Sequence, residues 1–258
     1  MNIYLYIVLI LVSFQISFSQ SPGNNGAIAG RVSLEGAVPP VPQLTVHKDV
    51  HCCGSTTPSP RLSVGKDNGL KNAVVYLETV AGGKRFDLTD PVLLDQKECH
   101  FDPHVIIVPY GGQLVIRNSD DVLHNVRAYH ISDGRTVFNI AQPIQGQQTS
   151  IRPALFDKPG IYHATCDAGH PWMSAFIVVA KHPYYAITDD NGRFILEDVP
   201  PGTYRLKVWH GGVHIKETRT SGNEIIQYIY EEPYVIKEEI DIRSGSVSPV
   251  EVMLQLRE

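Results

Sequence analysis

Residues 160–180 read GIYHATCDAGHPWMSAFIVVA. Two runs with the texture of β-strands, GIYHAT and SAFIVVA, flank a loop that contains Cys166, His170 and Met173. A thiolate, an imidazole and a thioether therefore fall within eight residues. Soft sulfur donors combined with imidazole suit copper, whereas zinc prefers four Cys or His ligands and rarely binds Met. The segment predicts a strand, a copper-binding loop and a second strand.

A third strong ligand has to come from elsewhere in the chain. Residues 101–126 read FDPHVIIVPYGGQLVIRNSDDVLHNV. In this stretch a strand-like run, a glycine turn and a second strand-like run end at His124, which Asn125 follows directly. The pattern is typical of paired strands, so we expect His124 to stand at the end of a strand and to complete the metal site.

These two stretches resemble the cupredoxins, the copper proteins of the plastocyanin and azurin type. That family pairs the motif N-x-D-x-x-x-H-N with a distal loop in which Cys, His and Met follow one another at short spacing. The first motif is matched here by Asn118, Asp120, His124 and Asn125, and the second by Cys166, His170 and Met173. The resemblance covers residues 88–181 and implies a Greek-key β-sandwich, which we assign to residues 86–182.

The resemblance also implies a role for each ligand. Cys166, His124 and His170 would form a trigonal plane around one copper, and Met173 would be a weak axial ligand. Asn125 would tie the two loops together by hydrogen bonds near the sulfur. The spacing C-x3-H-x2-M also resembles half of the binuclear copper loop of cytochrome oxidase subunit two. That centre needs a further Cys four positions earlier, where this chain has Tyr162, so we expect one copper per chain.

The rest of the sequence after residue 25 predicts an all-β protein. Short alternating runs such as AVVYLETV, QLVIRN and YRLKVW are separated by Gly, Pro, Asn and Asp. Turn signals recur about every ten residues, which is the spacing of sandwiches and barrels. No run of twelve residues has the periodicity of an amphipathic helix.

Two separated segments, residues 26–47 and 186–209, suggest a second domain. Together with Ala73–Leu77 they resemble the carboxypeptidase regulatory-like family of small transthyretin-like sandwiches, through the motifs AVVYL, TDDNGRF and PPGTY. More than one hundred residues separate the first of these motifs from the second, too many for a structureless loop. We therefore expect a split sandwich of residues 26–80 and 183–256, with the cupredoxin unit inserted and AVVYLE paired with the strand around Ala186–Thr188. The whole arrangement resembles exported bacterial plastocyanin-like proteins, some of the methylamine-utilisation type.

The N-terminal segment predicts export. Residues 3–18 are almost wholly apolar, no charge precedes Arg31, and the run ends in small and polar residues. We interpret residues 1–20 as a signal peptide and expect a periplasmic, cell-surface or secreted protein. The missing basic start leaves an uncleaved membrane anchor as the alternative.

Export changes the meaning of the four cysteines, because thiols pair in an oxidising compartment. With Cys166 assigned to the metal, we expect a disulfide between Cys53 and Cys99 and a free thiol at Cys52. A Cys52–Cys99 link and a second metal site at His51-Cys52-Cys53 remain alternatives.

Composition and motifs exclude several other functions. The net charge is −5 and no block of Lys and Arg occurs, so nucleic acid is not an expected partner. No G-x-S-x-G elbow or paired His-x-His motif is present, and we expect no enzymatic activity and no catalytic residue. His163 is expected at the surface. Pro171 and Trp172 would either pack in the loop or form an exposed docking edge for a redox partner protein. The leading hypothesis is a one-electron carrier, and the alternative is a copper store or scaffold.

Overall fold

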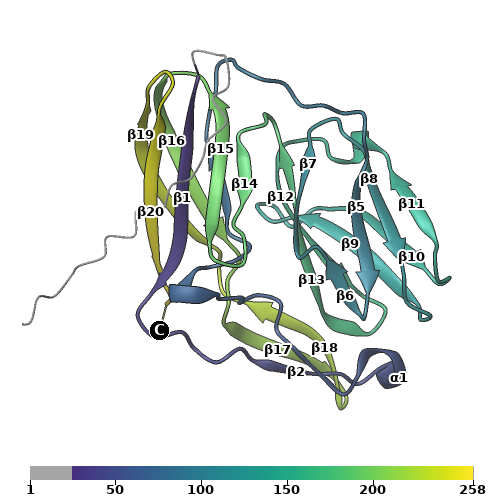
Figure 1. Cartoon of the computed structure of the whole chain (residues 1–258). Coiled ribbons are helices and arrows are strands. Elements are labelled where there is room, and N and C mark those ends of the chain that lie inside the picture. Colours follow the sequence, from purple (N-terminus) through teal and green to yellow (C-terminus); the bar gives the residue numbers. More distant parts are fainter. Residues whose placement is uncertain (1–24, 258) are drawn as a thin grey trace, which may run out of the picture.

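The computed structural model describes residues 25–257 and is built almost entirely of β-strands (Figure 1). Helical turns in this range are limited to α1 (Val50–Cys53), η1 (Lys66–Asn68) and η2 (Pro153–Leu155). The all-β prediction is confirmed. The proposed signal peptide, residues 1–20, lies outside the described residues. Across residues 25–257 no helix has the length and apolar character needed to span a membrane.

The first sandwich combines segments from both ends of the described chain. One sheet has the order β15–β1–β20, formed by Arg193–Val199, Gly26–Glu35 and Val247–Gln255. The facing sheet has the order β14–β4–β16–β19, formed by Tyr185–Ile187, Val74–Leu77, Gly202–His210 and Tyr234–Ile242. Figure 1 shows β1, in purple, between β15 and the yellow β20. A Cβ at Gly30 would lie 2.1 Å from the carbonyl oxygen of Val250, so only glycine allows β1 to approach β20 this closely.

The segments before and after the intervening residues form one core. The expected pairing of AVVYLE with the strand near residue 187 is present, with Ala186 opposite Val75. Buried side chains from Ile28 to Leu77 and from Tyr184 to Leu254 pack in a single apolar cluster. Alternating apolar residues on strands such as β1 explain this cluster, because successive side chains point to opposite faces of a sheet.

The residues between β4 and β14 form a second sandwich with its own core. Its larger sheet has the order β10–β9–β12–β13–β7, formed by Thr136–Gln142, His124–His130, Gly160–Cys166, His170–Ala180 and Val105–Pro109. The facing sheet has the order β11–β8–β5–β6, formed by Gln148–Ile151, Leu114–Asn118, Val92–Lys97 and His100–Asp102. Strands adjacent in sequence are often not adjacent in the sheets, so the connections cross between them.

Strand β13 joins the two sandwiches. Its residues from Trp172 to Ala180 are all buried, although a strand at a free sheet surface would alternate. One face, with Ala175 and Ile177, packs in the second core, while Phe176 and Val178 pack against Val74 and Trp209 of the first sandwich. The near-continuous apolar run SAFIVVA therefore reflects burial on both faces.

An N-terminal arm crosses from the first sandwich to the second. It contains β2 (Gln43–Thr45), α1 and β3 (Thr56–Pro58), and lies beside the hairpin of β17 (Ile215–Ser221) and β18 (Glu224–Tyr230) in Figure 1. Leu44 and Val46 enter the core of the second sandwich. A disulfide between Cys53 and Cys99 fastens α1 to the turn between β5 and β6, which confirms the predicted pairing, and Cys52 is free.

Candidate metal centre

Three of the predicted ligands lie at the ends of three neighbouring strands. His124 is the first residue of β9, Cys166 is the last residue of β12, and His170 is the first residue of β13. Because β9 and β13 both run antiparallel to β12, the starts of the outer strands meet the end of the middle one. The sheet order β9–β12–β13 therefore brings together residues up to 46 positions apart.

The donor atoms of these residues converge. The Nδ1 atoms of His124 and His170 are 3.1 Å apart, and Cys166 Sγ is 3.5 Å from His170 Nδ1. Their potential donor atoms all lie within 4.8 Å of one another, which is a spacing that can hold a metal ion. All three side chains are buried, with exposed fractions of 0, 0 and 4%. The arrangement supplies two imidazole nitrogens and one sulfur to a single point.

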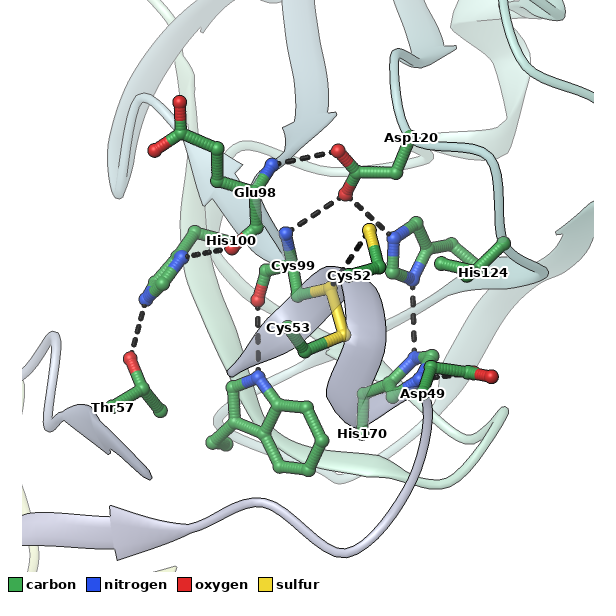
Figure 2. The surroundings of a disulfide bond; sticks show 12 residues. Asp49, Cys52, Cys53, Thr57, Glu98, Cys99, His100, Asp120, His124 and His170 are labelled. Carbon is green, nitrogen blue, oxygen red and sulfur yellow. Dashed lines mark hydrogen bonds and ion pairs between the residues drawn. A yellow bond between two sulfur atoms is a disulfide. The ribbon is translucent and has the colours of Figure 1, made fainter. Parts of the chain in front are cut away.

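The far nitrogen of each histidine has a carboxylate partner (Figure 2). His124 Nε2 lies 2.9 Å from Asp120 Oδ2, and His170 Nε2 lies 2.9 Å from Asp49 Oδ2. An ionised carboxylate only accepts hydrogen bonds, so each Nε2 carries the proton and donates it. In a neutral imidazole this leaves the Nδ1 lone pair unprotonated and free for a metal. The two carboxylates thus select the ligand-competent tautomer of both rings.

Burial controls the protonation of the centre. Burial raises the pKa of the Cys166 thiol, although the backbone N–H groups of Asn125 and Ala168 oppose this shift. Burial also lowers the pKa of His170, and the nearby His124 adds to the effect, so the ring stays neutral. At Asp120 burial acts to raise the pKa, but hydrogen bonds from His124 and from the backbone of Cys99 outweigh it and lower the pKa. Burial thus favours the neutral imidazole at His170, and hydrogen bonds favour the anionic form of the Asp120 carboxylate.

Two asparagines hold the loops that carry the donors. Asn125 Oδ1 accepts hydrogen bonds from the backbone N–H groups of Asp167 and Ala168, and its own N–H donates to Cys166 Sγ at 3.4 Å. The expectation that Asn125 ties the loops together near the sulfur is confirmed. Asn118 donates to the carbonyl oxygens of Val122 and Gln142 and accepts from the backbone of Asp120, so the turn before His124 is also fixed.

Met173 lies on the same strand as His170, three residues further along. It is 1% exposed and belongs to the same buried cluster as Cys166. Its place near the ligand loop agrees with the expected axial role, which stays a prediction.

Of the two roles left open for Pro171 and Trp172, the structure supports packing in the loop and contradicts an exposed docking edge. Trp172 is 1% exposed, its indole N–H donates to the Cys99 carbonyl oxygen at 3.1 Å, and its ring centroid lies 5.1 Å from that of His170. Pro171 is half-buried. The cause is the N-terminal arm, because α1, its disulfide and Asp49 cover the edge that the loop would otherwise expose.

Two further residues behave differently from the sequence interpretation. Asp49, which holds His170, was not identified, because it stands outside both motifs and 121 residues from its partner. His163, expected at the surface, is half-buried and lies in contact with Arg61, Tyr129 and Ser174. No sequence motif identifies either role, because the contacts Asp49–His170 and Arg61–His163 form only in the tertiary fold.

Comparisons with known proteins give one partial family match and several low-scoring structural matches. A family model described as polysaccharide lyase family 4, domain II, matches residues 167–225. No curated protein matches the chain. Among solved structures, the copper-containing nitrite reductase of Thermus scotoductus SA-01 matches with 23% identity and a TM-score of 0.30, over 41% of this chain and 25% of that one. The chain thus spans about a quarter of that enzyme's length.

Two smaller proteins match along nearly their whole length. A purple cupredoxin from Nitrosopumilus maritimus has 20% identity and a TM-score of 0.29, over 35% of this chain and 98% of that one. Amicyanin from Paracoccus versutus has 17% identity and a TM-score of 0.30, over 41% of this chain and 97% of that one. Likeness of this degree does not decide a function, which has to be argued from the side chains.

Proposed function

We propose that the chain is an exported mononuclear copper protein that carries one electron at a time. The observation that carries the proposal is the convergence of Cys166 Sγ with the Nδ1 atoms of His124 and His170, while both Nε2 atoms donate to carboxylates. Two imidazoles and one thiolate suit copper better than zinc, because a fourth Cys or His is missing from the group and a buried Met lies nearby.

The residues around the donors fit that role. Copper, when bound, would supply a one-electron couple, with Met173 as the weak axial ligand that tunes it. Asn125 and Asn118 hold the ligand loops through hydrogen bonds, and Asp120 and Asp49 orient the imidazoles. A centre held this firmly in a dry core rearranges little between two oxidation states, which favours fast electron transfer. No step of the proposal requires a catalytic residue, so we propose no enzymatic activity.

A second candidate function is copper storage or delivery. It is favoured by the burial of His170, which is 0% exposed beneath α1, and by its contact with Asp49 of the arm. A partner protein would find this edge covered, whereas an electron carrier benefits from a short path between its copper and its partner. Movement of the arm would then control access to the metal.

The proposal also covers the export of the protein and its domain organisation. We infer that residues 1–20 direct export to the periplasm or cell surface, where the Cys53–Cys99 disulfide is stable. We also infer that the first sandwich is a transthyretin-like domain into which the cupredoxin unit of residues 86–182 is inserted. The same inference includes a relationship to methylamine-utilisation-type proteins and a redox partner protein that exchanges the electron.

Spectroscopy of the copper-loaded protein tests the proposal. Wild-type protein should bind one Cu(II) per chain with an intense thiolate-to-metal band in the visible, and Cys166→Ser should lose that band, because a hydroxyl stays protonated and is a poor soft donor. Cys52→Ser, which removes the other free thiol, is the matched control and should keep the band. Colour that survives in Cys166→Ser would place the copper elsewhere. Reversible reduction and reoxidation at full copper occupancy would support the carrier, and copper loss on reduction would support the store.

A further inference from the structure

A cavity of about 700 Å³ lies where the two sandwiches and the β17–β18 hairpin meet. Its walls come from strands of the second sandwich, from β4 and β16 of the first, and from β18 of the hairpin. The wall residues that matter here are Arg61, Tyr129, His163, Phe176, Trp209 and Tyr230. Most of these are aromatic, so the cavity favours a flat apolar body.

Arg61 places a positive charge in this wall without a carboxylate partner. It is 6% exposed, and its guanidinium carbon lies 4.5 Å from the ring centre of Phe176 and 4.3 Å from that of Tyr230. Burial lowers the pKa of Arg61 to about 10, so the group is still charged at neutral pH. Within residues 25–257 it forms no ion pair with an Asp or Glu side chain, although buried charges are normally paired.

Glu231, a carboxylate in the same wall, already has other partners. Glu231 accepts hydrogen bonds from the backbone N–H groups of Val213 and His214 and from the hydroxyl of Tyr234, and it also pairs with Arg257. Glu231 therefore does not neutralise Arg61.

The hydrogen bonds around His163 leave two donors without an acceptor. Arg61 Nη2 can only donate, so His163 Nε2, at 2.9 Å, accepts and carries no proton. Burial lowers the pKa of His163 well below its usual value, so the ring is neutral and its proton lies on Nδ1. Nδ1 then donates to the Tyr129 oxygen at 2.5 Å, which leaves the Tyr129 hydroxyl proton free to point elsewhere. Arg61 Nε is buried and also has no acceptor in the described part of the chain.

We propose that this cavity binds a small organic anion, a carboxylate attached to a flat apolar body. The carboxylate accepts hydrogen bonds from Arg61 and Tyr129, and the apolar body packs against Trp209 and Tyr230. Arg61 Nε is closed to solvent, and Tyr230, which lies against the guanidinium, is a half-buried residue at the end of β18 whose hydroxyl lies 3.1 Å from Ser59 Oγ. The ligand reaches the guanidinium edge when the Tyr230 ring moves aside. The site is separate from the metal centre.

Calorimetric titration of the metal-free protein with benzoate tests the proposal independently of copper. One benzoate should bind per chain with a dissociation constant of about 1 mM or tighter, since ligands of this size gain a few tenths of a kcal/mol or more per heavy atom. Benzamide, which has the same shape without the charge, should bind at least about tenfold more weakly. Arg61→Gln should abolish the binding of benzoate, and Arg205→Gln, an exposed arginine paired with Glu78, should leave it unchanged.

Two further variants keep the test decisive if Arg61→Gln does not fold. Arg61→Lys keeps the charge and should retain weakened binding, and Tyr129→Phe should weaken benzoate several-fold and benzamide less. Equal binding of benzoate and benzamide, or no loss in any of these variants, would overturn the proposal. Binding of inorganic phosphate as tight as that of benzoate would overturn the apolar part and leave only an anion site.

Discussion

The candidate metal centre and the Arg61 cavity are both polar clusters built around histidine, but they are complementary in charge. At the candidate metal centre, carboxylates accept hydrogen bonds from the Nε2–H groups of His124 and His170, so the Nδ1 lone pairs converge at 3.1 Å. At the cavity, Arg61 donates to His163, and N–H and O–H donors are left without acceptors. Converging lone pairs call for a cation, and converging donors call for an anion. The hydrogen-bond partner of Nε2, a carboxylate or an arginine, therefore decides whether the site suits a cation or an anion.

Acid should break the Arg61 cluster, and we expect the largest effect there. Two further histidines, His104 and His210, feel the charge of Arg61. Burial lowers the pKa of His104 to about 3 and that of His210 to about 4, and it lowers the pKa of His163 well below its usual value. The unfolded chain takes up these protons near pH 6.5, while the folded chain does not do so until about pH 4 or below. The free energy of unfolding should therefore fall as the pH drops from 6.5 toward 4, by on the order of several kcal/mol.

Urea unfolding of the metal-free protein at a series of pH values between 7 and 4 measures this slope. His210→Gln removes one of the three groups and should flatten it. A free energy of unfolding that stays constant over this range would show that these histidines are protonated equally in both states.

Removal of the disulfide should uncover the metal centre. The double variant Cys52→Ser/Cys53→Ser should lose roughly 2–4 kcal/mol of stability, because the disulfide restricts the unfolded chain. His170 should then become reachable by external imidazole, since α1 no longer holds Asp49 in place. Cys52→Ser is the control and should behave as wild type.

The single variant Cys53→Ser has a different expected result. Cys52 Sγ lies 3.9 Å from Cys99 Sγ, so a Cys52–Cys99 link should form in its place. Peptide mapping without reduction identifies the linked pair. Free thiols at both positions would mean that α1 cannot rotate to bring Cys52 onto Cys99.

Replacing the carboxylates behind the histidines by amides should lower the copper affinity of the candidate metal centre and so test its contrast with the cavity. Asp120→Asn and Asp49→Asn should each lower copper affinity by roughly 10–100-fold, because partners behind a ligand histidine fix its tautomer and raise its basicity. Competition with a copper chelator measures the loss. Asp121→Asn, at an exposed neighbouring position, should bind copper as wild type does. Equal affinity in all three variants would show that the imidazoles need no carboxylate support.

Met173→Leu should have the smallest effect. We expect copper to be retained within a few-fold of wild-type affinity, with a changed reduction potential, because an axial thioether tunes the metal more than it holds it. Voltammetry of the loaded variant measures the change. Complete metal loss would make Met173 an anchor and would favour the storage function.

The sequence predicted the parts of the molecule that follow from local pattern. Alternating apolar residues and frequent turn residues predicted the all-β fold, and the two motifs located His124, Cys166 and His170 at strand ends. The number of thiols, together with the expectation of export, predicted one disulfide and one free thiol, and the structure has the preferred Cys53–Cys99 pairing rather than the alternative Cys52–Cys99. The sequence did not reveal that α1 would cover the metal-binding edge, because the motifs describe only the second sandwich.

What the sequence determined by itself is the set of candidate donors and the neighbouring strands, since the residue types of a motif and the alternation of strand residues are local properties. The tertiary structure alone decided what surrounds those donors. Asp49 meets His170 across 121 residues, and Arg61 meets His163 across 102, because the N-terminal arm packs across both sandwiches. Such contacts depend on how distant segments pack against each other, and local sequence patterns do not predict which distant residue a side chain will contact.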